Sequence, residues 1–312
     1  MFPSTVLFGF FLISQVCIGV LTNSSLFMAL MYTFLTQPQL MRPIDSIMIH
    51  MTVVNNLTII VTLTPYIKAS FGVRHFLNDA GCKVILYAYR VTRGVSICTT
   101  SLMSTFQAIT ISPITSKWAR LKSKLSAMII PSLLIFWISN LLIYIFVIEN
   151  IRANGNFSLV GRGYSHVYCQ SRQMTTMSSW SLIILMLACD FVFLTLMICT
   201  SLYMVSLLYR HHRRAKYVHR PSYQTPAEIR ATQIIVLLLS CFALFYCSNN
   251  IFTFYSISTY QKIPALEGIS AMLSSCYPTI SPLFLIKSNK MVSQFFCFAV
   301  MRFIRPQTTF NG

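Results

Sequence analysis

Residues 6–35 read VLFGFFLISQVCIGVLTNSSLFMALMYTFL and carry no charged side chain. A helix of about 20 apolar residues crosses a hydrocarbon layer of about 30 Å, so this run is long enough to span a membrane. Six further runs of about 20 to 30 residues share its apolar character. The seven runs cover residues 6–35, 46–67, 82–111, 125–148, 180–208, 232–255 and 267–286.

These runs can cross a membrane only as helices. Lipid offers no partner to backbone N–H and C=O groups, so the spanning structures are helices and closed barrels. Barrel strands alternate between apolar and polar residues over about 10 residues, and the seven runs do not. The sequence therefore predicts an all-α membrane protein, a seven-transmembrane helix bundle.

The composition leaves little room for a domain outside the membrane. Of the 312 residues, 55% are hydrophobic and 10% are charged. Soluble domains rarely have fewer than about 50 residues, and every segment between the runs is shorter than that. We therefore expect a single seven-transmembrane domain over residues 1–312. The net charge of +18 would suggest nucleic acid in a soluble protein, but here membrane lipid is the expected partner and nucleic acid is not.

The basic residues are distributed unevenly between the two sets of loops. If the N-terminus lies outside, fifteen of the 24 Lys and Arg residues fall on the inner side and six on the outer side. This bias follows the positive-inside rule. It predicts an external N-terminus and a cytosolic C-terminus.

Two of the ten cysteines differ from the others in their expected surroundings. Cys82 opens the third run and Cys169 lies in the long outer loop, so these two alone lie near water on the oxidising side. A disulfide between them would hold that loop over the bundle. The same loop contains Asn156, which is the credible glycosylation acceptor because the other two Asn-x-Ser/Thr sequences, at Asn23 and Asn56, fall inside spans.

A few charged residues lie at membrane depth, where an ionisable side chain is costly and usually functional. Asp190 lies ten residues into the fifth run and Arg93 eleven residues after Cys82, so we expect them at similar depths. Arg90 lies one turn nearer the outside on the same face as Arg93. Together with Glu267, at the outer end of the last run, these residues are candidates for binding a ligand. The alternative is a structural Arg93–Asp190 ion pair and a solvated Glu267.

A second group of basic residues lies on the expected inner side. Residues 210–216 (RHHRRAK) are expected to continue the fifth helix inward. Anionic lipid explains part of this charge, and a partner protein that reads the opening of the fifth and sixth helices explains it equally well. The candidates for that contact are Arg120, Lys122, Arg213, Arg214 and Arg230.

The sequence shows no signature of catalysis or of metal binding. It lacks a His-Glu-x-x-His motif, a glycine-rich phosphate loop and a Gly-x-Ser-x-Gly motif. It has six Asp and Glu residues, and His211 and His212 lie among arginines, as on a solvated basic face. We therefore expect a protein that is not an enzyme and that has no cofactor and no metal site.

Two prolines interrupt the last run. Pro278 and Pro282 each remove a backbone N–H from a helix interior, which predicts a bend in the seventh helix. The bend is either a structural kink or the hinge of a two-state switch.

Longer motifs resemble those of a known family, the vomeronasal type-1 receptors. The resemblance covers the third span and second inner loop, the entry to the sixth span, the first inner loop and the last span, and it extends over essentially the whole chain. The matching segments are residues 93–100 (RGVSICTT), 107–113 (QAITISP), 118–122 (WARLK), 225–233 (TPAEIRATQ), 42–45 (RPID) and 281–286 (SPLFLI).

The resemblance implies a G-protein-coupled receptor that detects pheromones or social odours, placed in the plasma membrane of sensory neurons of the vomeronasal organ. It implies an inhibitory-class heterotrimeric G protein as the partner. It also implies an outer-loop glycan, which maps to Asn156, and a disulfide, which maps to Cys82 and Cys169. The chain lacks the Asp-Arg-Tyr and Asn-Pro-x-x-Tyr motifs of larger rhodopsin-like receptors, and vomeronasal receptors share this departure.

Three alternatives remain at this point. Bitter-taste receptors are the rival within the receptor class. A multi-span transporter is the rival from another class, although the spans hold few ionisable groups for a continuous polar path. A receptor that no longer signals is the third alternative.

Overall fold

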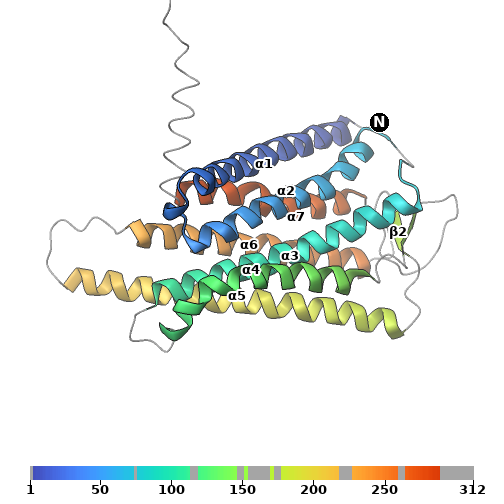
Figure 1. Cartoon of the computed structure of the whole chain (residues 1–312). Coiled ribbons are helices and arrows are strands. Elements are labelled where there is room, and N and C mark those ends of the chain that lie inside the picture. The colour runs from blue at the N-terminus through green and yellow to red at the C-terminus, as the bar shows by residue number, and fades with distance from the viewer. Residues whose placement is uncertain are drawn as a thin grey trace, which may run out of the picture.

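The computed structural model describes residues 3–73, 76–112, 119–145, 151–153, 169–171, 177–217, 227–258 and 264–288. Within these ranges the chain forms seven long helices and one pair of short antiparallel strands (Figure 1). The predicted seven-helix bundle is confirmed. The two strands were not predicted, because a segment of three residues is too short to show a strand pattern in the sequence. The elements are α1 (Pro3–Thr36), η1 (Pro38–Leu40), α2 (Pro43–Ser70), α3 (Asp79–Ile111), α4 (Ala119–Tyr144), β1 (Ile151–Ala153), β2 (Cys169–Ser171), α5 (Met177–Tyr217), α6 (Ala227–Ser258) and α7 (Pro264–Ser288).

Every helix begins at least three residues before the apolar run that predicts it. An apolar run marks only the part of a helix that faces lipid. The helix itself begins earlier, at a residue that can cap its first turn. Asn78 caps α3 because its side chain accepts a hydrogen bond from the N–H of Gly81 at 2.8 Å. At the start of α2, Asp45 accepts a hydrogen bond from the N–H of Arg42, also at 2.8 Å.

Two helix ends differ from their predicted boundaries by four residues or more. α4 ends at Tyr144, before the predicted boundary at residue 148, and residues 146–150 lie outside the described part of the chain. α5 continues to Tyr217, well beyond the boundary at residue 208. The added segment is basic, so an apolar pattern cannot detect it, but the expectation that residues 210–216 continue the fifth helix is confirmed.

α3 lies in the middle of the bundle and packs against α2, α4 and α5 (Figure 1). α1 packs against α2 and α7, and α6 packs against α5 and α7. α3 also touches α6, but over a much shorter segment than it shares with its other neighbours. α3 and α5 are therefore neighbours, as any contact between Arg93 and Asp190 would require.

The helices differ in how much they face lipid. Large apolar side chains on α1 and α5 point outward, with Leu7 72% and Phe191 68% exposed, as on a surface that contacts acyl chains. α3 instead buries Thr92, Ser96 and Thr99 against neighbouring helices, so its composition is more polar. In the described residues, five helical segments are long and apolar enough to cross a membrane, and α6 adds the shorter apolar stretch Val236–Phe252. The five are Ser4–Thr36, Pro43–Ser70, Lys124–Tyr144, Ala188–Arg210 and Leu266–Lys287.

A buried polar network joins α1, α2 and α7 beside the two prolines of α7. Pro282 has no N–H, so the carbonyl of Pro278 loses its helical donor. The Asn23 amide replaces that donor, since its Nδ2 donates to the Pro278 oxygen at 2.9 Å. Asn55 Nδ2 in turn donates to Asn23 Oδ1 at 3.2 Å and to Ser281 Oγ at 2.9 Å. Asn23 is fully buried, which agrees with its rejection as a glycosylation acceptor.

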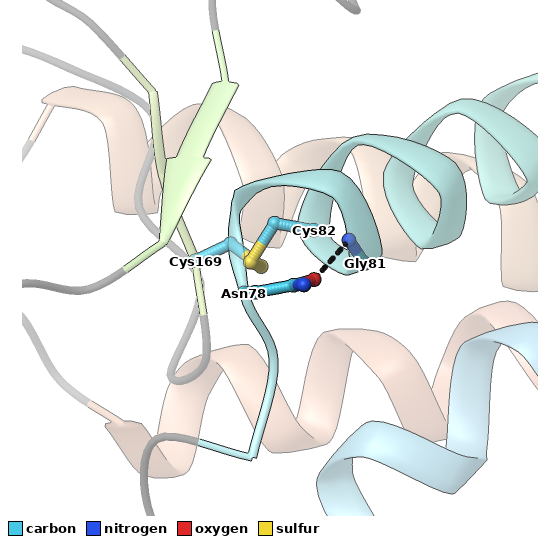
Figure 2. Close-up of a disulfide and its surroundings, with 4 residues drawn as sticks. All are labelled: Asn78, Gly81, Cys82 and Cys169. Atoms are coloured by element: carbon cyan, nitrogen blue, oxygen red, sulfur yellow. Dashed lines mark hydrogen bonds between the residues drawn. A yellow bond between two sulfur atoms is a disulfide. The ribbon is translucent and has the colours of Figure 1, made fainter.

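A disulfide joins α3 to the strand pair. Figure 2 shows Cys82 in the first turn of α3, beside the Asn78 cap, bonded to Cys169 of β2, with a Cα–Cα distance of 5.9 Å. Both cysteines are fully buried, and β1 packs against α3. The strands lie at the end of the bundle where α1 begins (Figure 1). The predicted bridge between Cys82 and Cys169 is therefore present.

We expect Cys82→Ser, Cys169→Ser and the double variant to lower cell-surface expression to the same extent, at least severalfold. Each variant opens the same bridge, and removing such a bridge costs about 2–5 kcal/mol in small secreted domains. Flow cytometry of an N-terminally tagged receptor measures the loss. Cys17→Ser, at an exposed cysteine of α1, is the matched control and should express normally. A double variant that expresses less than either single variant would contradict a shared role.

We expect Asn23→Ala to lower the apparent melting temperature of the purified receptor. The variant leaves the Pro278 carbonyl without its Asn23 donor and removes one of the two acceptors of the Asn55 amide. A buried polar group left unsatisfied costs about 1–3 kcal/mol. Asn56→Ala is the control, because Asn56 makes one part-buried contact of 3.2 Å to Ser24 Oγ. Equal shifts in the two variants would show that the α7 carbonyl does not depend on Asn23.

Candidate functional site

Arg93 lies near the middle of α3, and its guanidinium is bound by uncharged oxygens. Nη1 donates to the Tyr89 hydroxyl at 3.2 Å and Nη2 donates to Asn250 Oδ1 at 2.6 Å. In the amide orientation that satisfies both ends of Asn249, its oxygen accepts from Nη1 at 2.9 Å and from Nη2 at 3.2 Å. Its Nδ2 then donates to Ser270 Oγ of α7 at 2.6 Å. One charged side chain of α3 therefore holds two consecutive amides of α6.

Tyr246 connects Arg93 to Asp190. The Arg93 guanidinium lies over the Tyr246 ring, 4.8 Å from its centroid, which is a cation–π contact. The Tyr246 hydroxyl donates to Asp190 Oδ2 of α5 at 2.5 Å. The direct Arg93–Asp190 ion pair considered above is therefore wrong for this structure, in which the salt bridge found among the described residues joins Arg42 to Asp45. Equal depth along two helices did not reveal that a side chain of α6 lies between them.

We call Tyr89, Arg93, Tyr246, Asn249 and Asn250 the Arg93 cluster. It draws residues from α3 and α6 and reaches α5 through Asp190 and α7 through Ser270. The two other candidate ligand-binding residues lie outside it. Arg90 lies 5.9 Å from the centroid of the Tyr89 ring and is half-buried, whereas Glu267 is half-buried in the first turn of α7.

A cavity borders the cluster between α2, α3, α6 and α7. It encloses about 390 Å³ of empty space when the space at its open side is counted. Arg93 and Asn249 line it, whereas Asn250, Asp190, Arg90 and Glu267 do not. The remaining wall is apolar, aromatic or hydroxyl-bearing, and includes Ile97, Phe245, Leu273, Ser96, Ser274 and Thr58.

Aromatic rings connect the cluster to α7. Phe242 stacks on Tyr246 with 5.7 Å between ring centroids and meets Tyr277 edge to face at 4.6 Å. The Tyr277 hydroxyl lies 3.3 Å from Thr100 Oγ1 of α3. Tyr277 precedes Pro278, whose carbonyl Asn23 binds. A displacement of Tyr246 would therefore be passed through Phe242 to the proline-containing part of α7.

The opposite end of the bundle carries the basic candidates for a partner contact. The start of α4, the end of α5 and the start of α6 all lie at the end away from β2 (Figure 1). Arg213 is exposed there. The same three helical segments contain the other candidates, whose side chains the structure does not describe: Arg120, Lys122, Arg214 and Arg230. Asn156, the predicted glycosylation site, lies wholly outside the described residues.

Sequence reasoning missed most of the Arg93 cluster. Asn249 and Asn250 carried a usable signal, because two consecutive amides inside an apolar span are costly and need partners. Tyr246 and Tyr89 carried none, since a tyrosine in an aromatic-rich span is also ordinary packing. Tyr203 was missed as well, and its hydroxyl lies 2.9 Å from Ser112 Oγ, joining α5 to the end of α3.

Comparison with known proteins extends the similarity over nearly the whole chain. The model of the vomeronasal organ pheromone receptor family matches residues 6–298. Vomeronasal type-1 receptor 4 of Homo sapiens is 34% identical over 293 residues, which cover 93% of this chain and 97% of that receptor. Olfactory receptor class A-like protein 1 of Danio rerio is 28% identical over 282 residues, covering 88% of this chain and 87% of that protein.

A solved structure has the same fold. The crystal structure of squid rhodopsin superimposes with a TM-score of 0.69 and 16% identity, covering 96% of this chain and 88% of that one. At this identity the likeness shows the arrangement of the seven helices alone.

We expect a double-mutant cycle between Tyr246→Phe and Asp190→Ala to show coupling of about 1 kcal/mol or more. Each variant breaks the same hydrogen bond, so the double variant should lose little beyond either single variant. The apparent melting temperature of the purified receptor supplies the measurement. Tyr209→Phe, at a tyrosine that is 65% exposed on α5, should change nothing. Strictly additive losses would show that the two side chains act independently.

Proposed function

Because the chain belongs to the vomeronasal organ pheromone receptor family and is a G-protein-coupled chemoreceptor, we propose that pheromones or small social odorants bind in the cavity beside Arg93. The family membership decides against the bitter-taste receptor and the transporter. The observation that carries the proposal is the cavity itself, because its wall joins α3 to α6 and α7 at a place where the charge of Arg93 holds α3 and α6 together.

The position of the cavity suggests how binding is converted into a signal. α6 packs mainly against α7 and α5, and its smaller contact with α3 includes the hydrogen bonds from Arg93 to Asn249 and Asn250. A ligand that contacts Arg93 or Tyr246 changes the hydrogen bonds that hold α6. It then favours a state in which the inner ends of α5 and α6 separate, to the extent that it binds that state more tightly.

The inner ends of the same helices suit a partner protein. α5 has 41 residues, and at 1.5 Å per residue it is about 60 Å long, roughly twice the thickness of the hydrocarbon layer. Its basic end, with Arg213 exposed, projects beyond the membrane and would meet a heterotrimeric G protein of the inhibitory class. Arg120, Lys122, Arg214 and Arg230 are proposed to add to this surface, with anionic lipid sharing the same charge.

The charge bias of the loops supports the orientation in the membrane. Basic residues concentrate at one end of the bundle, which we assign to the cytosol together with the C-terminus, and the disulfide end faces outside. The chain is a multi-pass plasma-membrane protein, and the sensory neurons of the vomeronasal organ are its proposed site. Asn156 of the outer loop is the proposed glycan acceptor.

The test is a signalling assay in cells that express the chain with a promiscuous G protein or an inhibitory one, challenged with urinary and steroid extracts. We expect a calcium rise in the first cells and a fall in cyclic AMP in the second. Ser274→Phe fills the cavity and should abolish the response or raise the half-maximal concentration at least tenfold, without loss of surface expression. Ser240→Phe, at an exposed position of α6, is the matched control and should respond normally.

Two outcomes would contradict the proposal. A Ser274→Phe receptor that responds like the unmodified one would place the ligand elsewhere. Silence to every extract, despite confirmed surface expression, would count against a functioning chemoreceptor.

A further inference from the structure

We infer that Tyr246 keeps two opposite charges apart: when α6 moves away from α3, Arg93 and Asp190 form a direct ion pair, and this pair stabilises the signalling state of the bundle. The role in signalling rests on the proposed function, which requires α5 and α6 to separate. The pairing itself concerns three side chains and can be measured without a signal.

One short segment of α6 holds both charges in the described structure. Asn249 and Asn250 accept hydrogen bonds from Arg93, and the Tyr246 ring lies against the guanidinium. Among the described residues, the hydrogen-bond donor found for Asp190 is the Tyr246 hydroxyl. A movement of α6 away from α3 therefore takes partners from the cation and from the anion at the same time.

This loss is costly unless the two charges find new partners. Lipid cannot solvate an ion, so a guanidinium and a carboxylate inside the bundle depend on the protein for compensation. A buried charge that loses its partner is strongly destabilising, because it remains uncompensated. When α6 leaves, the opposite charge that the bundle offers to Arg93 is Asp190. Direct pairing therefore offsets part of the cost of moving α6.

α3 and α5 place the two charges at the same depth. A hydrogen bond between the Ser104 and Thr200 hydroxyls fixes the register of these helices, which both run away from the β2 end (Figure 1). Arg93 lies eleven residues before Ser104. Asp190 lies ten residues before Thr200, so the two depths differ by about 1.5 Å. Packed helices lie about 8–10 Å apart, a distance that the long arginine side chain can span.

α3 and α5 are also held together without help from α6. α3 packs along α5, and the Tyr203 hydroxyl lies 2.9 Å from Ser112 Oγ at the end of α3. Ser112 donates its own hydrogen to the carbonyl of Ala108 at 2.8 Å, so Tyr203 is the donor to Ser112. The two helices therefore form a frame that keeps the charges within reach of each other while α6 moves.

The same charges thus have two arrangements. In the described one, the Tyr246 ring separates Arg93 from Asp190, and α6 is held against α3. In the other, the ring has left, the planar guanidinium binds the carboxylate side by side, and α6 is released. A ligand that displaces Tyr246 favours the second arrangement to the extent that it binds that arrangement more tightly.

The first measurement is the coupling between the two charges, with the ring and without it. Arg93→Gln and Asp190→Asn each remove a charge and keep a polar side chain. The cycle is made in the unmodified chain and in Tyr246→Ala, and apparent melting temperatures are measured on purified full chains in nanodiscs. We expect the non-additive part of the melting shift to be about twofold larger or more in Tyr246→Ala, because the charges then pair directly.

Phe136→Ala is the matched control background. Phe136 of α4 is a half-buried ring that meets Phe193 of α5 edge to face at 5.8 Å, so the variant removes an aromatic contact without uniting the two charges. The coupling should stay at the level of the unmodified chain. If Tyr246→Ala does not fold, Tyr246→Leu supplies the same measurement, since leucine keeps apolar volume but has neither ring nor hydroxyl.

The second measurement is basal signalling in cells that express an inhibitory G protein and receive no extract. We expect Tyr246→Ala to raise basal signalling severalfold, seen as a lower level of forskolin-stimulated cyclic AMP at equal surface expression. Adding Asp190→Asn should return the level to that of the unmodified chain. Tyr246→Phe should raise signalling less than Tyr246→Ala, because its ring still separates the charges. Phe136→Ala should leave basal signalling unchanged.

The outcomes distinguish the ion pair from the proposed function. Equal coupling with and without the ring would overturn the pairing. Larger coupling without a rise in basal signalling would overturn its role in the signalling state. A response to extracts that Ser274→Phe abolishes, with equal coupling in both backgrounds, would overturn the pairing while the proposed function stands. Larger coupling and raised basal signalling, in a receptor that no extract activates, would support the pairing and count against the proposed function.

Discussion

The guanidinium of Arg93 lies at the middle of a lipid-embedded bundle, where the surrounding acyl chains cannot solvate its charge. The protein must supply the missing solvation, and it does so from three other helices. Two amides and a tyrosine of α6 contact the charge directly, a carboxylate of α5 is reached through that tyrosine, and a serine of α7 positions one amide. The rotation of α6 about its own axis is therefore set by a charge on α3.

The same constraint acts a second time around α7. A proline inside a helix frees a carbonyl that lipid cannot satisfy, and Asn23 of α1 donates to it. Between the two polar sites, Phe242 packs on Tyr246 of the first site and on Tyr277, the residue before Pro278 at the second. Aromatic packing thus separates two polar networks, each of which includes helices that are distant in sequence. This arrangement explains how binding in a small cavity can alter contacts among several helices at once.

The sequence predicted those features that depend on one segment at a time and not on how the helices pack. Seven helices follow because every apolar run must cover the same hydrocarbon thickness, and the Cys82–Cys169 bridge was expected because only those two cysteines lie near water on one side. The sequence also predicted the depth of Arg93 and Asp190 in the membrane. Depth alone does not say which side chains lie between two helices. Placing Tyr246 between them requires the rotation and lateral position of α6, which arise from packing among helices. The sequence also predicted that the fifth helix continues into the basic segment at its end. The three-residue strands are too short to show a periodic pattern.

The disulfide also has a consequence for the order in which the chain is assembled. Its two cysteines are 87 residues apart and enclose α3 and α4, so it can close only after both helices have been inserted and the strand pair has reached the oxidising compartment. The bridge can therefore form before α6 and α7 are in place, which would fix the outer end of α3 to the strand pair first. In that order of events, Tyr246 and Asn249 reach a charge whose helix is already tied at its outer end.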